Sequence, residues 1–358
     1  MIDFAARVHG MLYGSAIGDA VGAPLEFVEP PLGHAHWRHG EQLTTSHIEK
    51  LTSRFQMRRS QREAEPFGYW LKDAPLGSIT DDTRFKLLFI QALDREKVIT
   101  GMAIARAILS FEDGAYEVLA QEWLSEFREA AKWALNQGGL PPDRMWGGIE
   151  SLAGQLIFLP LAALHPGRPE AAYLHAWSAN IFDTGVAKDI NSAVVAGLSV
   201  ALAGGDWAEI RSHMLRVDPY KFGQAVYGER PLAKWIDNAE SWVSTSQRQP
   251  RKLFELLETR LEAQVWWEAW VPVVIMFASL QMVDYHPVAA MQLALEFGHD
   301  TDSYLQLMGA FIGAMYGPDV FPASMREQVN TQLEQQYDTS LDTWSQRLIQ
   351  CQGRQSEA

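Results

Sequence analysis

Residues 10–22 read GMLYGSAIGDAVG and place a glycine at every fourth position from Gly10 to Gly22. Residues four apart share one face of a helix, so this spacing lines that face with hydrogen atoms and lets a neighbouring backbone approach closely. Gly309 and Gly313, each followed by alanine, repeat the pattern near the C-terminal end. Although each helical glycine costs about 0.5 to 1 kcal/mol relative to alanine, we expect these two helices to pack together at the centre of the fold. Tight packing alone and a functional role both remain open.

The rest of the chain also has the spacing of helices. Residues 85–93 carry apolar side chains three and four positions apart, and residues 190–202 and 254–270 look similar. No Asn-Gly or Asp-Gly turn joins two β-branched runs, which argues against hairpins. These patterns predict an all-α fold, a compact single domain of many helices over residues 1–337. A polar C-terminal tail, residues 338–358, is expected to begin as a helix and to fray at its end.

Residues 30–77 differ from the rest of the chain. The segment opens with two prolines, carries four histidines and continues with a basic run. The histidine spacing does not match a zinc signature, which usually includes cysteine or a histidine pair four residues apart. We expect an insertion that is either a lid over a site or a solvated loop.

The composition is that of an ordinary globular protein, with 358 residues, 47% of them hydrophobic. The net charge of −14 repels phosphate backbones, which excludes nucleic acid as a partner, and attracts divalent cations. The single cysteine, Cys351, rules out an intrachain disulfide, and no signal peptide is evident, so we expect a cytoplasmic location. The longest apolar stretch, residues 265–283, is interrupted by Glu268, Pro272 and Gln281, which favours a buried helix over a membrane span.

Two short acidic clusters, residues 80–83 (TDDT) and 300–303 (DTDS), lie roughly 200 residues apart, each before a run that reads as a helix. Carboxylates and hydroxyls without histidine or cysteine are hard oxygen ligands, which Mg²⁺, Mn²⁺ or Ca²⁺ prefer. Helix capping is the alternative, because residues 78–81 match a capping box. Adjacent Asp81 and Asp82 diverge by about 100° on a helix, so they converge on one ion only from a turn that precedes the helix. Taken alone, the clusters leave metal binding and capping open.

Three segments, residues 18–27 (GDAVGAPLEF), 79–83 (ITDDT) and 298–303 (GHDTDS), resemble in order and spacing the signature motifs of the ADP-ribosylglycohydrolase family. The similarity extends over roughly residues 8–318. That family includes the dinitrogenase-reductase-activating glycohydrolases and the ADP-ribosylarginine and ADP-ribosylserine hydrolases. The resemblance implies an all-α fold with a two-metal centre, Mg²⁺ or Mn²⁺, in a cleft that binds the ribose attached to the target.

Matched residue by residue, the resemblance implies six metal ligands in the second and third motifs. They are Thr80, Asp81, Asp82, Asp300, Asp302 and Ser303. Ser303 stands where the family usually has threonine and keeps the hydroxyl group. Glu26 stands at the position of the family's mobile acidic residue, which reaches the metal site or the substrate. Asp19 is expected either to contact the substrate or to orient a helix.

The implied chemistry follows from charge. Hydrolysis at an anomeric carbon passes through an oxocarbenium-like state, so the site has to stabilise positive charge on the ribose and supply a water. Two metal ions can orient the ribose hydroxyls and lower the pKa of a bound water, while a carboxylate transfers the proton. Glu26 is the first candidate for this acid-base role. Asp82 or Asp302 could share it, although a carboxylate that binds a cation is a poorer base because the cation lowers its pKa.

The middle of the chain departs from the family pattern. Family members commonly have an Asn-Gly-x-x-Met-Arg-like loop that contacts the ADP-ribose phosphates, followed by a histidine-containing motif. The corresponding segments are residues 146–155 (WGGIESLAGQ), with Gln155 in place of the arginine, and residues 180–185 (NIFDTG), without the histidine. The glycine pair can still approach a diphosphate through backbone N–H groups, while Glu150 opposes an anion. The expected substrate-binding residues are Asp19, Gly147, Gly148, Glu150 and Gln155.

Three hypotheses follow from these residues. The first is a hydrolase that cleaves ADP-ribose from a protein side chain such as arginine, or from a small molecule. The second is a related glycoside hydrolase with a binuclear metal site that acts on another ribosylated or nucleotide-like compound, as the altered middle segments suggest. The third is a non-catalytic structural or binding member of the family, against which the retained metal-binding side chains argue. The expected partner is an ADP-ribosylated substrate, and neither a membrane nor nucleic acid.

Overall fold

The computed structural model describes residues 2–23, 26, 77–110, 125–136, 150–224, 228–261, 263 and 265–356. The insertion expected at residues 30–77 lies outside the described residues except for Gly77, and Gly147 and Gly148 lie outside them as well. In the described part of the chain every regular element is a helix, and the one β-type pairing is an isolated bridge between Ser151 and Glu268. The prediction of an all-α fold is confirmed.

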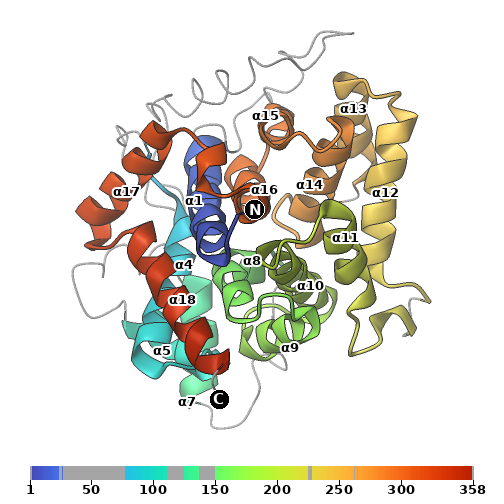
Figure 1. Ribbon diagram of the computed structural model, residues 1–358. Coiled ribbons are helices and arrows are strands. Elements are labelled where there is room, and N and C mark those ends of the chain that lie inside the picture. Colours follow the sequence, from blue (N-terminus) through green and yellow to red (C-terminus); the bar gives the residue numbers. More distant parts are fainter. Residues whose placement is uncertain are drawn as a thin grey trace.

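The helices follow one another around a central pair (Figure 1). Their bounds are α1 (Phe4–Gly22), α4 (Asp81–Glu96), α5 (Gly101–Ser110), α7 (Ser125–Asn136), α8 (Ala153–Ile157), η3 (Leu159–Leu164), α9 (Pro169–Ala179), α10 (Gly185–Leu202), α11 (Trp207–Arg216), η4 (Phe222–Gln224), α12 (Pro231–Thr245), α13 (Pro250–Arg260), α14 (Trp270–Met282), α15 (Pro287–Phe297), α16 (Thr301–Tyr316), η5 (Pro318–Val320), α17 (Ala323–Tyr337) and α18 (Leu341–Ser356).

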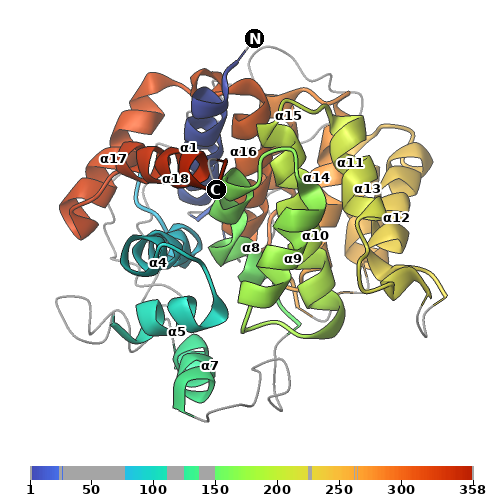
Figure 2. The ribbon, with the colours of Figure 1, turned by 60° about the horizontal axis from the view of Figure 1, so that its bottom comes forward.

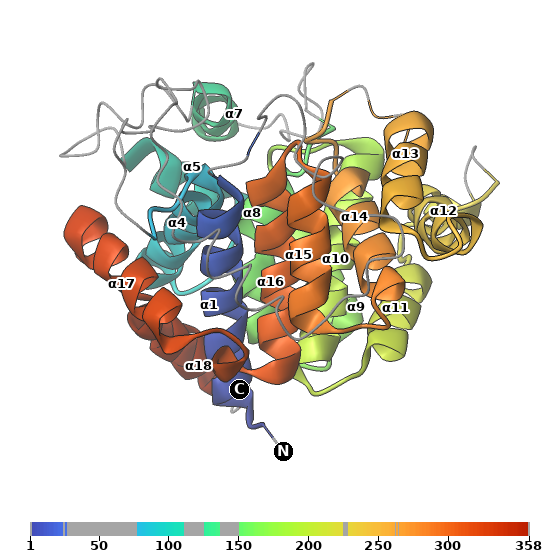
Figure 3. The ribbon, with the colours of Figure 1, turned by 90° about the horizontal axis from the view of Figure 1, so that it is seen from above.

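The central pair consists of α1 and α16, which lie side by side (Figure 3). A Cβ atom placed on Gly14 would lie 2.0 Å from the carbonyl oxygen of Gly309, and one on Gly10 would lie 2.0 Å from that of Gly313. Such distances are impossible for a real side chain, so only glycine allows this approach. The predicted packing of the two glycine-lined helices is confirmed.

The close approach continues to the end of α1 and brings two sequence motifs together. A Cβ on Gly22 would lie 2.5 Å from the backbone nitrogen of Asp302, at the start of α16. The Thr301 hydroxyl also donates a hydrogen bond to the carbonyl oxygen of Gly22 at 2.7 Å. The glycine stripe therefore fixes the first motif against the third.

Other helices cover this pair from two sides. α4, α5, α7, α17 and α18 lie on one side, and α10 to α14 lie on the other (Figure 2). α14 lies within the apolar stretch 265–283 and is buried along nearly its whole length, so the prediction of a buried helix there is confirmed. α10 is long and apolar enough to cross a membrane, but 89% of it is buried inside the protein, as in a core helix.

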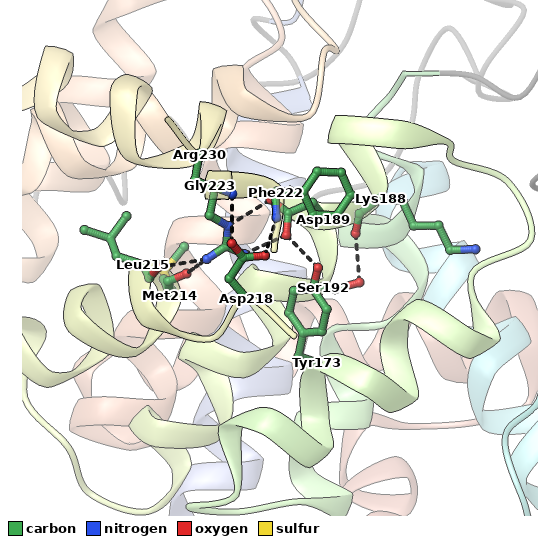
Figure 4. A network of polar contacts seen from close by, with 10 residues as sticks. All are labelled: Tyr173, Lys188, Asp189, Ser192, Met214, Leu215, Asp218, Phe222, Gly223 and Arg230. Carbon is green, nitrogen blue, oxygen red and sulfur yellow. Dashed lines mark hydrogen bonds and ion pairs between the residues drawn. The ribbon is translucent and has the colours of Figure 1, made fainter. Parts of the chain in front are cut away.

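A buried ion pair joins α9, α10 and the start of α12 (Figure 4). The Arg230 guanidinium donates to both carboxylate oxygens of Asp189, at 2.6 and 2.9 Å, and the Tyr173 hydroxyl donates to the same carboxylate at 2.6 Å. Arg230 also donates to the carbonyl oxygens of Met214 and Leu215 near the end of α11. Both charges have hydrogen-bond partners, as a buried ion pair requires. The pair anchors α10 to its neighbours α9 and α11 and to the start of α12.

The last helix, α18, is packed against the rest of the protein. Trp344 and Leu348 are fully buried, and the helix contacts α1 and η3. The tail expected from residue 338 is therefore not detached, because the apolar side chains of an otherwise polar helix reach the common core. The division of the chain at residue 337 stays a prediction.

Candidate functional site: an acidic cavity

The start of α4 is held in place by Asp19 of α1. The buried Asp19 carboxylate accepts hydrogen bonds from the backbone N–H groups of Thr80, at 3.0 Å, and Thr83, at 3.1 Å. The Thr80 hydroxyl in turn accepts from the N–H of Asp82 at 3.0 Å, as an N-cap residue does. Asp19 therefore orients the helix, which was one of its two expected roles, and it does not line the cavity described next.

The start of α16 is built differently, because its N-cap carboxylate does not cap it, while the backbone N–H of Ser303 donates to Asp302 Oδ1 at 3.1 Å. Asp300 occupies the N-cap position but makes no side-chain cap hydrogen bond. Gly298 and His299 before it have φ angles of 89° and 65°, which turn the chain sharply ahead of the helix. Asp300 and Asp302 both line the cavity described next, and the sharp turn before the helix is what the convergence argument from the sequence requires.

Both acidic clusters face one cavity of about 270 Å³. One oxygen from each of Glu26, Asp300 and Asp302 lies within 4.8 Å of the other two, a spacing that a single ion could bridge. The cavity is lined by Glu26, Asp81, Asp82, Phe85, Phe127, Ser151, Leu152, Ala153, Leu156, Trp267, Asp300, Asp302 and Ser303. The structure thus brings together six of the predicted catalytic and metal-ligating residues. Thr80 lies directly behind them.

The carboxylates of the cavity repel one another. Burial raises the pKa values of Asp81, Asp82 and Asp300 well above the usual range, and the charge of Asp302 raises each of them further. Among the described residues, Asp82 Oδ2 and Asp300 Oδ2 are buried and have no hydrogen-bond partner. Buried, unpartnered carboxylate oxygens next to like charges are costly unless a cation joins them. The residues present therefore fit hard divalent cations.

One buried cation lies behind the acidic cluster. Lys86, on α4, is 2% exposed, and its ammonium group donates to the carbonyl oxygen of Asp82 at 2.8 Å and to Gln306 Oε1 at 2.7 Å. Burial lowers the pKa of Lys86 to about 8, while the nearby aspartates act in the opposite direction. The sequence did not predict a buried position for Lys86, because a lysine in an amphipathic helix is usually one of its polar, solvent-facing residues.

Much of the remaining cavity wall is apolar and aromatic. Phe85 and Phe127 contact each other, with ring centroids 4.6 Å apart, and Trp267, with 38% of its surface exposed, also lines the cavity. A backbone hydrogen bond from Leu152 to the carbonyl oxygen of Trp267 joins the wall's two segments. Sequence reasoning missed these aromatic residues because nothing local distinguishes them from core residues.

Asp183 supports this wall from behind. Its buried carboxylate accepts from the Ser151 hydroxyl, the Gly154 N–H and the side-chain amides of Asn180 and Asn191, at 2.6 to 3.1 Å. Burial raises the pKa of Asp183 to about 6, although the four hydrogen bonds oppose the shift. The segment NIFDTG (residues 180–185), which lacks the histidine of the family motif, thus contributes a structural carboxylate. Sequence reasoning did not assign that role.

Gln155 does not line the described cavity. It is fully buried outside the cavity lining, and its amide nitrogen donates to Asn191 Oδ1 at 2.8 Å and to the carbonyl oxygen of Ala269 at 2.7 Å. These two acceptors turn its amide group inward, and its expected contact with substrate stays a prediction. Glu150 is exposed and lies beside Gly185, also outside the cavity lining.

Fold and site together define a class: an all-α protein in which carboxylates from distant parts of the chain gather at one cavity suited to divalent cations. The model of the ADP-ribosylglycohydrolase family matches residues 1–357, so the chain belongs to this family of glycohydrolases. A solved structure described as an ADP-ribosylglycohydrolase-related protein complex is similar in fold, with a TM-score of 0.60 and 16% sequence identity. It covers 98% of this chain and 99% of its own. The comparison with curated proteins found no match.

Proposed function

We propose that this protein is a metal-dependent hydrolase that cleaves the glycosidic bond between ADP-ribose and an acceptor, and so reverses ADP-ribosylation. The observation that carries the proposal is the meeting of both acidic clusters and Glu26 at one cavity. Membership of the ADP-ribosylglycohydrolase family supports the reaction type. The third hypothesis, a non-catalytic member, is disfavoured because it leaves these carboxylates without a purpose that offsets their mutual repulsion.

The proposed cofactor is a pair of Mg²⁺ or Mn²⁺ ions. Asp81, Asp82, Asp300, Asp302 and Ser303 line the cavity and would hold them, with the Thr80 hydroxyl immediately behind. When bound, such ions orient vicinal hydroxyl groups and make a water molecule a better nucleophile at neutral pH. The donors are all oxygen atoms, which favours these ions over zinc or copper.

The chain's own groups have three tasks in the proposed reaction. The carboxylates stabilise the positive charge that develops on the ribose as the bond breaks. Glu26, within 4.8 Å of Asp300 and Asp302, is the candidate that moves a proton between the water and the leaving group. Asp82 and Asp302 are weaker candidates for this role, because a carboxylate that binds a cation has a lowered pKa and is a poorer base. The apolar wall of Phe85, Phe127 and Trp267 limits access of bulk water.

The second candidate function is hydrolysis of another ribosylated or nucleotide-like compound. It is favoured by one observation, the inward orientation of Gln155 at the position where the family has a phosphate-contacting arginine. The described lining of the cavity contains no basic side chain, so its charges favour a cationic or neutral leaving group over an anionic one.

The test is the release of free ADP-ribose from defined substrates. The protein, supplied with Mg²⁺ or Mn²⁺, is incubated with peptides ADP-ribosylated on arginine and on serine, and with small ribosylated compounds. We expect release from at least one ADP-ribosylated acceptor and a loss of about 10²-fold or more in the rate with Glu26→Gln. Cleavage of other ribosylated compounds alone would favour the second candidate. No turnover of any substrate would leave only the non-catalytic hypothesis.

A further inference from the structure

Lys86 occupies an unusual place for a lysine. Its side chain lies behind the acidic cavity between α4 and α16, and it is 2% exposed. Lysine is seldom buried to this degree, because removing its charge from water is costly. A fully buried ammonium group therefore requires a compensating interaction.

The compensation does not come from a carboxylate in direct contact. The ammonium group donates to two neutral oxygens, the carbonyl of Asp82 and Oε1 of Gln306. Gln306 is itself fully buried on α16, and its Oε1 also accepts from the Ser15 hydroxyl of α1 at 3.1 Å. In the described part of the chain, no carboxylate oxygen lies within ion-pair distance, 4.0 Å, of the Lys86 nitrogen. The positive charge thus stays unpaired and acts on the cavity beyond it.

The field of Lys86 falls on the proposed cation ligands. The aspartates that favour its charged form are Asp82, Asp19 and Asp81. The other nearby cation, Arg84, acts on Asp81, and its guanidinium donates to the Tyr337 hydroxyl and the carbonyl oxygen of Ile79. Lys86 differs from Arg84 because its ammonium group donates directly to the backbone carbonyl of a proposed ligand, Asp82, and to Gln306 of the helix that carries Asp302. A neutral residue at this position would leave the carboxylates with a stronger attraction for divalent cations.

We propose that Lys86 is a countercharge built into the acidic site, which stabilises the cavity without bound metal and weakens its affinity for divalent cations. The inference rests on the proposed function, since it assumes that the cavity binds such ions. One positive charge accounts for both effects: it offsets carboxylate repulsion in the cation-free protein and repels an incoming cation. The consequence is a site that exchanges its metal more readily than five carboxylates alone would.

The test measures Mn²⁺ binding to the purified full chain at pH 7 by calorimetry and by the loss of the free-ion electron paramagnetic resonance signal. Lys86→Gln removes the charge and keeps a hydrogen-bond donor, and Lys86→Arg keeps the charge. Gln306→Glu keeps Lys86 and pairs it with a carboxylate of nearly the same shape. Lys132→Gln, at a partly exposed lysine on α7, is the matched control.

We expect Lys86→Gln and Gln306→Glu each to bind Mn²⁺ about tenfold more tightly or better, because a unit charge several ångströms away acts through a low effective dielectric. Lys86→Arg and the control are expected to stay within about threefold of wild type. The melting temperature of metal-free Lys86→Gln should fall, and its rise on Mn²⁺ addition should exceed that of wild type.

Two results would overturn the inference. If folded Lys86→Gln and Gln306→Glu bind Mn²⁺ as wild type does or more weakly, Lys86 is only a structural link between α4 and α16. If wild type binds no Mn²⁺, Mg²⁺ or Ca²⁺, the metal site of the proposed function fails and this inference fails with it. The affinity of wild type thus distinguishes the two failures.

Discussion

At the residue scale, the carboxylates of the cavity have two opposing effects. They destabilise one another in the metal-free protein, since burial and the charge of Asp302 raise the pKa values of Asp81, Asp82 and Asp300. The same oxygens, two of them buried and unpartnered in the described structure, are what a divalent cation requires. Stability and metal binding are therefore expected to change in opposite directions when these residues are neutralised.

Replacing Asp81 and Asp302 together by asparagine tests this opposition. The double variant should lose hydrolase activity and the thermal stabilisation by metal, which amounts to about 2.7 kcal/mol at a concentration 100 times the dissociation constant. Its metal-free melting temperature should equal or exceed that of wild type, because two repelling charges are gone. Thermal scans with and without Mn²⁺ measure both effects, and Asp284→Asn, at an exposed ion pair, serves as control. Metal stabilisation that survives in the double variant would refute the ligand assignment.

Asp183 gives a prediction for pH. Its pKa is raised to about 6 by burial, above the value in an unfolded chain, so the folded protein binds its proton more tightly between pH 4 and 6. The contribution of Asp183 to stability is therefore present at low pH and is lost as the pH rises through 6.

The variant Asp183→Asn removes this titration while keeping an oxygen for the three N–H donors. As the pH rises from 4 to 6.5, wild type should lose about 2 to 3 kcal/mol of unfolding free energy relative to the variant. Urea unfolding at a series of pH values measures it. A difference that does not depend on pH would mean that the carboxylate titrates normally in the fold.

At the element scale, the decisive contact is that between α1 and α16. A Cβ on Gly14 would meet the backbone of Gly309 at 2.0 Å, and no side-chain rotation relieves a clash with backbone. Because these helices carry the first and third motifs, their approach also sets the distance between Gly22 and Asp302. The packing of this helix pair therefore also determines the geometry of the site.

Gly14→Ala should lower the free energy of unfolding by about 3 kcal/mol, at the upper end of what overpacking costs. Gly223→Ala is the matched control, since a Cβ there would have no neighbour nearer than 3.4 Å. Chemical denaturation of the two variants measures the difference. Equal stability of Gly14→Ala and wild type would show that the helices separate easily and that the glycine spacing does not fix their approach.

The elements also show how far the sequence could predict this protein. The four-residue glycine spacing predicted the α1–α16 pair, because the face of a helix on which a residue lies is set by its position in the sequence. The acidic clusters predicted, for the same reason, side chains that meet at one cavity, and their role as metal ligands stays a prediction. Asp183, Trp267 and Lys86 escaped prediction because their roles depend on neighbours distant in sequence. The inward orientation of Gln155 was not predicted, because the position of a residue in a motif does not reveal which way its side chain points.

At the scale of the whole molecule, one cavity gathers groups from distant parts of the chain: Glu26 beyond the end of α1, the start of α4, α7, the α8 region, Trp267 before α14 and the start of α16. The net charge of −14 draws cations toward the protein as a whole, and Lys86 opposes this attraction locally. Membership of the family supports a glycohydrolase reaction type.

The most direct measurement is the time course of ADP-ribose release from a mixed pool of ADP-ribosylated peptides, first with protein stripped of metal by a chelator and then after addition of Mn²⁺. The proposed function predicts no release before addition, release that begins with Mn²⁺, and none at any time with the Asp81→Asn, Asp302→Asn double variant. Release that is equally fast in the chelator, or that persists in the double variant, would contradict the assignment of the acidic cavity as a metal-dependent hydrolytic site.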